Sequence, residues 1–210
     1  MTTAALDTTQ LFAIAAALGW ASGLRLSAVV FLTGMAGYLG WVALPPGLTV
    51  LQQPAMLWAS GCLLMVEFAA DKVPWIDSLW DTAHTFIRIP AGAALAYGAL
   101  GGDQGTWAMV AALLGGTLAA TAHTAKATTR AAANTSPEPF SNIGLSLAGD
   151  ALVPAMLWLS WEHPVLFFVA LAVVVIVMMV ATVLLFKYLR GLERKLRGHF
   201  LPTQPRPEGS

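Results

Sequence analysis

The sequence predicts an all-α protein, a polytopic transmembrane helical bundle, and three observations carry this prediction. Apolar residues make up 57% of the 210 residues and charged residues only 10%, whereas a soluble domain carries about 25% charged residues. The mean hydropathy is +0.69. The apolar residues gather in long runs, as helices that cross a bilayer require. We expect a single domain, 1–200, followed by a polar tail, 201–210, that is disordered.

Hydrophobic segments divide the chain into about seven parts. They are 8–23, 26–44, 54–70, 89–100, 105–122, 143–161 and 164–186. The last is long enough to span a membrane, and the fourth is short and rich in Ala and Gly, so we place it inside the bundle. The bundle has seven spans if Arg25 ends the first one, and six if Arg25 lies within one long broken helix. A weak similarity between the two halves would fit a two-fold internal repeat.

The distribution of basic residues predicts the orientation. With seven crossings, all eleven Lys and Arg fall on the side of the C-terminal tail, and the opposite loops contain none. The positive-inside rule then places the C-terminus in the cytoplasm. The first residues carry no Lys or Arg, so we expect no cleaved signal peptide. The basic stretch 187–197 should extend the last span as an amphipathic helix along the lipid surface.

An acidic pattern follows the third segment. Glu67 and Asp71 are four residues apart and share a helix face. After Pro74, a second helix places four polar residues on one stripe, at i, i+4, i+7 and i+11: Asp77, Asp81, His84 and Arg88. Carboxylates and an imidazole on one stripe suit a divalent cation or a proton path, with the metal unknown, and a solvated stripe is the structural alternative.

A basic stripe mirrors the acidic one. His123, Lys126, Arg130 and Asn134 follow the same spacing after the fifth segment. Because both stripes lie on the same side of the membrane, we expect a charge ladder of Asp77 and Asp81 against Lys126 and Arg130. The ladder is either a salt-bridged cap or a gate that opens when a substrate competes for one stripe.

A polar path enters the sixth segment. The two prolines within 136–142 predict a turn there and not a helix. Asn142, Ser146 and Asp150 then follow at i, i+4 and i+8. A carboxylate inside a membrane span costs a few kcal/mol (~2.5–3.5 on insertion scales), so Asp150 should face the bundle interior. We expect it near His123 or Lys126.

These motifs together resemble the domain of unknown function 4126 family. The matching pieces are Gly23-Leu-Arg25, Glu67-x-x-x-Asp71-Lys72-x-Pro74-x-x-Asp77, the helix ending near Arg88, His123-x-x-Lys126-x-x-x-Arg130 with Asn134-Thr-Ser-Pro137, and Ser146-Leu-Ala-Gly-Asp150. The resemblance covers nearly the whole chain. It implies a bacterial multi-pass membrane protein, which we expect in the inner membrane, and no known activity.

Three functions fit these patterns. The first is a small transporter or permease with a cation or proton site in the cytoplasmic half of the bundle, built from Glu67, Asp71, His123, Lys126 and Asp150. The second is an anion or lipid-phosphate handler that uses Arg25, Lys126 and Arg130, since arginine matches phosphate oxygens. The third is a scaffold that transports nothing.

Other classes are not expected. Serine-nucleophile, P-loop and zinc motifs are missing from the sequence, so we expect no enzyme and no cofactor. The expected partners are membrane lipid and a small ion or molecule, with no nucleic acid, and a homo-oligomer stays open.

Overall fold

The computed structural model describes residues 6–70, 74–101, 105–135 and 139–200. At 74, 75, 77–79, 81, 83, 139–142 and 195–200 it describes the backbone alone. Over these residues the chain forms helices and no strands. The elements are α1 (Thr8–Tyr38), the 3₁₀ helix η1 (Pro46–Gln52), α2 (Pro54–Ala70), α3 (Pro74–Leu100), α4 (Gly105–Ala133), α5 (Pro139–Glu162) and α6 (Pro164–Phe200). The prediction of an all-α fold is therefore confirmed.

Four of these helices are long and apolar enough to cross a membrane. They are α1, α4, α5 from Ile143 and α6 to Arg194, and the bent pair η1 and α2, at 70° to each other, passes the same test together. About 20 apolar residues are needed for one crossing. The protein is therefore a multi-pass helical membrane protein. The number of spans and the internal repeat stay predictions.

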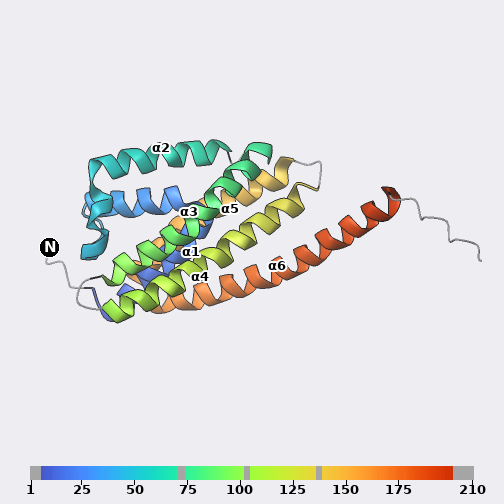
Figure 1. Cartoon of the computed structure of the whole chain (residues 1–210). Coiled ribbons are helices and arrows are strands. Elements are labelled where there is room, and N and C mark those ends of the chain that lie inside the picture. Colours follow the sequence, from blue (N-terminus) through green and yellow to red (C-terminus); the bar gives the residue numbers. More distant parts are fainter. Residues whose placement is uncertain (1–5, 71–73, 102–104, 136–138, 201–210) are drawn as a thin grey trace, which may run out of the picture.

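Helix α1 is broken at Arg25 and doubles back. Arg25 has φ −148° and ψ 81°, which is not helical. Gln10 donates a hydrogen bond to the Trp161 carbonyl, and Ala36 lines a cavity together with Trp161. A straight helix would hold Gln10 and Ala36 about 39 Å apart, at 1.5 Å per residue. Both therefore reach the same end of α5 because the two halves of α1 run in opposite directions (Figure 1).

The bundle has two chemically different ends. The aromatic end holds Trp41, Trp158 and Trp161, and there the indole of Trp161 donates to the Ala43 carbonyl. The charged end holds the break at Arg25, the C-terminal part of α4 and the first half of α5. Helix α6 starts at the aromatic end and passes the charged end, since its 37 residues are about 55 Å long. Figure 1 shows it reaching beyond the other helices.

Helix α1 forms the centre of the bundle and α6 its edge. Within their most apolar stretches, 78% of the residues of α1 are buried and only 6% of those of α6. The first half of α1 approaches α4 so closely that a Cβ atom on Gly19 would lie 2.4 Å from the Cα atom of Gly115. Only glycine fits at this crossing. Close backbone contact through small residues is typical of helix packing in membranes.

Several predicted boundaries need correction. The second segment was expected to reach residue 44, but α1 ends at Tyr38, and Gly40, with φ 69°, turns the chain. The helix from Pro74 and the segment 89–100 are one helix, which passes through Pro90. The prediction of a turn over 136–142 is wrong for its second half, because α5 begins at Pro139. Proline suits the first turn of a helix, where its missing N–H has no partner to lose. The expected extension of the last segment is confirmed, since α6 continues to Phe200.

Candidate functional site

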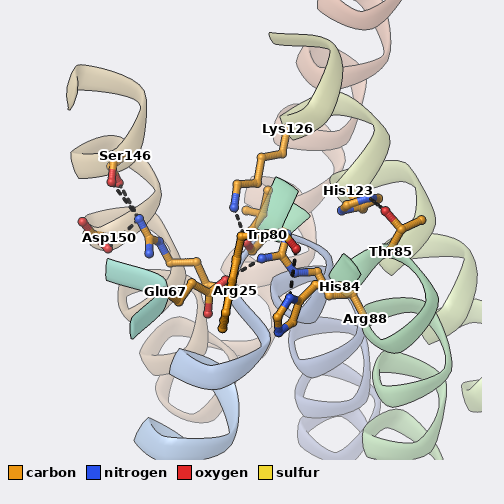
Figure 2. Close-up of polar contacts among 11 residues, drawn as sticks. Arg25, Glu67, Trp80, His84, Thr85, Arg88, His123, Lys126, Ser146 and Asp150 are labelled. Carbon is orange, nitrogen blue, oxygen red and sulfur yellow. Dashed lines mark hydrogen bonds and ion pairs between the residues drawn. The ribbon is translucent and has the colours of Figure 1, made fainter. Parts of the chain in front are cut away.

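The charged end contains two buried arginine–carboxylate pairs. Arg25 lies at the break in α1, and its Nη2 is 2.9 Å from Oδ1 of Asp150 on α5. Arg88 on α3 lies 2.6 Å from Oε1 of Glu67 on α2. The second pair is almost completely buried, with both side chains at most 1% exposed, whereas the side chain of Asp150 is 25% exposed. Figure 2 shows both pairs among the polar contacts of this end.

Asp150 has its described ion pair with Arg25. We expected the carboxyl near His123 or Lys126, and that expectation stays a prediction beside this pair. Two residues of the expected polar path share this partner, because Arg25 Nη2 also donates to the hydroxyl of Ser146 at 2.9 Å and to its carbonyl at 3.3 Å. One guanidinium thus joins two successive turns of α5 to the break in α1. Asn142, the third residue of the path, has its side chain outside the described residues.

The break in α1 has a local consequence for Lys126. A break in a helix leaves carbonyl groups without their intrahelical donors. The carbonyl of Leu24, just before the break, accepts a hydrogen bond from Lys126 Nζ at 3.3 Å. Lys126 on α4 and Asp150 on α5 therefore contact neighbouring residues, Leu24 and Arg25, at the break in α1. Neither the carbonyl nor the break could be located from hydropathy alone.

The two histidines lie at separate contacts. His123 Nε2 is 2.8 Å from the hydroxyl of Thr85, which links α4 to α3. His84 stacks on Trp80, with ring centroids 4.2 Å apart, and its Nδ1 donates to the Trp80 carbonyl at 2.9 Å. His84 is therefore engaged within its own helix. Thr85 was not among the predicted residues, and no pattern in the sequence singles it out.

The two predicted stripes lie on antiparallel neighbours. Thr85 is opposite His123, Gly92 is opposite Ala119, and a Cβ atom on Gly115 would meet Ala96. Continuing this register by one and two turns brings residue 81 level with about 127 and residue 77 level with about 131. The register agrees with the predicted ladder. The side chains of Asp77 and Asp81 and all of Asp71 lie outside the described residues, so the ladder itself stays a prediction.

A cavity of about 210 Å³ lies beside Arg25, between α1, α4, α5 and α6. Three basic side chains line it: Arg25, Lys126 and Arg130. Arg25 and Arg130 are buried and Lys126 is half-buried. Among the described residues that line it there is no Asp, Glu or His. The described part of the chain likewise contains no group of three His, Cys, Asp or Glu residues placed to hold a metal ion.

Two carboxylates of the predicted cation site, Glu67 and Asp150, belong to separate ion pairs among the described residues. Glu67 and Asp150 each pair with an arginine from another helix, and each keeps one buried oxygen with no hydrogen-bond partner among the described residues. By contrast, all three residues of the alternative anion site line one cavity. Sequence reasoning missed the cavity's other wall, formed on α6 by Val177, Met178 and Ala181. In the sequence these three residues cannot be distinguished from the lipid-facing residues of the same long apolar run.

Comparison with known families identifies one family that covers most of the chain. Residues 12–183 match the family described as Domain of unknown function (DUF4126), and the chain belongs to that family. The match includes every residue of the two ion pairs and all the lining residues of the cavity. No similar curated protein and no similar solved structure was found.

Proposed function

We propose that this member of the DUF4126 family is a small transporter of the bacterial inner membrane whose binding site takes an anion. One observation carries the proposal: Arg25, Lys126 and Arg130 line a single cavity of about 210 Å³. Charged groups within a membrane span are costly, and those that occur there commonly mark the path of a substrate or ion. Arginine offers two parallel N–H groups to a phosphate or carboxylate, so the site suits such an anion.

The positions of the carboxylates indicate that the site binds an anion. Glu67 and Asp150 already have arginine partners at 2.6 and 2.9 Å, so their charges are largely compensated. Among the described lining residues of the cavity, Lys126 and Arg130 supply the positive charge beyond the Arg25–Asp150 pair, and none is a carboxylate. An arriving anion would compete with Asp77 and Asp81 of the predicted ladder for Lys126 and Arg130. This competition is the gate that we infer for the charged end.

A proton is the second candidate, and Asp150 favours it. Its side chain is 25% exposed, and one of its oxygens has no hydrogen-bond partner among the described residues. Protonation of this carboxyl would release the Arg25 guanidinium, which lines the cavity. A proton taken up at Asp150 would then raise the positive charge available to the anion. The two candidates combine in a proton-coupled anion transporter.

The orientation and the absence of catalysis belong to the same proposal. The charged end and the basic residues of α6 at Lys187 and Arg190 would face the cytoplasm, as the positive-inside rule expects. The aromatic end would lie at the opposite interface, where tryptophan side chains gather. We assign no catalytic residue, because the polar groups of the charged end are arranged as ion pairs and as the wall of a cavity.

The proposal is tested by measuring thermal unfolding of the purified protein in detergent with added salts. Sodium phosphate should raise the midpoint above that in sodium chloride of equal ionic strength, since a ligand that binds only the folded state stabilises it. Lys126→Gln should remove the difference, and Lys187→Gln, a cation on α6 outside the cavity, should keep it.

Two other results would point elsewhere. If magnesium chloride stabilises the protein and Asp150→Asn abolishes that effect, the site takes a cation. If no salt shifts the midpoint and every variant behaves like the parent, the charged end is a structural clamp and the protein is a scaffold.

A further inference from the structure

We infer that the cavity at Arg25 takes an amphiphilic anion, a phosphate ester whose hydrocarbon chain leaves the bundle between α5 and α6. This inference rests on the proposed anion site and specifies its ligand class. It follows from the composition of the two walls, from the position of the opening and from the size of the cavity.

The two walls of the cavity differ in chemistry. The guanidinium groups of Arg25 and Arg130 and the ammonium group of Lys126 come from α1 and α4. The side facing them consists of apolar residues from α5 and α6: Leu145, Ala148, Gly149, Leu152, Val177, Met178 and Ala181. Among the described lining residues the one hydroxyl, on Thr129, donates to the Ala125 carbonyl of its own helix. One half of a ligand must therefore be anionic and the other half apolar.

The opening of the cavity lies on the flank of the bundle. Leu145 and Ala148 on α5 and Val177 on α6 line the cavity and are also exposed on the outside of the protein. Helix α6 is the most exposed of the spanning helices, with 6% of its most apolar stretch buried. In a membrane this flank faces hydrocarbon and not water. A ligand can therefore enter sideways from the lipid, and its chain can stay there.

The volume of the cavity limits how much of the ligand can lie inside it. The cavity, about 210 Å³, is smaller than the roughly 300–1,000 Å³ of sites that enclose a whole drug-sized ligand. It accommodates a phosphate group and the first carbons of a chain. The rest of the chain must leave through the opening between α5 and α6, along the exposed face of α6.

A free inorganic phosphate would contact only the basic wall of this cavity. It would contact the basic side chains but leave the side chains of Leu152, Val177 and Met178 without any part of the ligand against them. A methylene placed there is removed from water, which strengthens binding by about fourfold for each fully buried group. A cationic amphiphile would match the apolar wall and be repelled by Arg25, Lys126 and Arg130. The charge and the apolar wall together select an anion with a chain.

The test uses a series of alkyl phosphates of increasing length, with inorganic phosphate as the shortest member. Binding to the purified protein is measured by thermal unfolding and by calorimetry below the micelle concentration of each ligand. We expect the dissociation constant to fall by about twofold to fourfold for each of the first few methylenes and then to level off. An alkyl trimethylammonium ion of the same length should not bind at the cavity.

Matched variants separate the two walls. Ala181→Trp fills the apolar side of the cavity, so the affinity should no longer increase with chain length. Val173→Trp places the same ring on the exposed face of α6 outside the cavity, so the increase in affinity with chain length should remain. Lys126→Gln should weaken every phosphate in the series by a similar factor. If the affinity of Ala181→Trp still increases with chain length, the chain binds elsewhere and the inference is wrong.

The outcomes also separate this inference from the proposed function. If inorganic phosphate binds and the alkyl chain adds nothing, the anion site stands and the amphiphilic ligand is excluded. If no phosphate binds and Lys126→Gln changes nothing, both fail. The source of the ligand is resolved in nanodiscs: phosphatidic acid in the disc competes with octyl phosphate if the ligand is a lipid headgroup, and does not compete if it is a soluble ester.

Discussion

Arg25, at the break in α1, forms an ion pair of 2.9 Å with Asp150 in α5 and donates to Ser146 one turn earlier. This contact ties the most central helix of the bundle to the helix that carries the only acidic side chain within 143–161. It also defines one side of the cavity to which we assign an anion. The relationship therefore has consequences for stability that can be measured separately from transport.

Removing one member of this pair should lower the free energy of unfolding. Removing both should lower it by less than the sum of the two single losses. Asp150→Asn keeps the shape and leaves Arg25 without its carboxylate. An uncompensated buried charge costs ~3–5 kcal/mol, and the partial exposure of Asp150 favours the lower end. Denaturation of Asp150→Asn, Arg25→Gln and the double variant in detergent gives the coupling free energy. Simple additivity of the two changes would show that the pair contributes nothing.

The pair of Glu67 and Arg88 should be the more sensitive one, because both side chains are fully buried. Glu67→Gln should cost ~3–5 kcal/mol of unfolding free energy. The exposed Glu162→Gln is the matched control and should change it by less than ~0.5 kcal/mol. Glu67→Leu combined with Arg88→Met should restore most of the loss, since an apolar pair avoids the cost of burying charges. If Glu67→Gln unfolds no earlier than Glu162→Gln, the pair is not formed.

The predicted ladder between α3 and α4 can be tested through Asp81. The antiparallel register brings residue 81 level with about 127, within reach of Lys126 and Arg130. Asp81→Ala should lower the unfolding midpoint, and the additional change Lys126→Gln or Arg130→Gln should recover part of the loss. Independent effects in both double variants would mean that the stripes do not touch.

The crossing of α1 and α4 should not tolerate a methyl group. A Cβ atom on Gly19 would lie 2.4 Å from the Cα atom of Gly115, a distance that forces the helices apart. Gly19→Ala should therefore destabilise the protein by ~1–3 kcal/mol. Gly144→Ala in α5 meets nothing within 4 Å and should be neutral or slightly stabilising, because alanine favours helix. Equal effects of the two changes would place this crossing elsewhere.

The orientation predicts which surface a membrane-impermeant thiol reagent reaches. In a Cys62→Ser background, which removes the one exposed native thiol, Thr49→Cys and His163→Cys at the aromatic end should be labelled on intact cells. Thr135→Cys, exposed beyond the charged end, should be labelled only after the cells are opened. The reverse pattern would invert the topology and the proposed cytoplasmic site with it.

Much of the fold could be predicted because hydropathy and proline positions act locally. Pro54 and Pro164 begin helices where the apolar runs begin, and the basic extension after residue 186 is helical as its periodicity predicted. The prediction failed at Pro139 and Pro90, since a proline can start a helix or lie within one when neighbouring groups accommodate it. Whether Arg25 ended a helix could not be decided from the sequence, because one residue with non-helical dihedrals leaves no trace in an apolar average.

The sequence by itself determined that this is a helical membrane protein, which residues carry charge within it, and that Asp150 lies in an otherwise apolar run. Each of these depends on composition and spacing along one helix. Only the tertiary structure decided that Asp150 pairs with Arg25, that Glu67 pairs with Arg88, and that Lys126 and Arg130 share a cavity with α6. The physical reason is that a buried charge takes the partner brought within about 3 Å by the packing and rotation of neighbouring helices, and this packing is set by contacts such as Gly19 on Gly115 that lie far from the charges themselves.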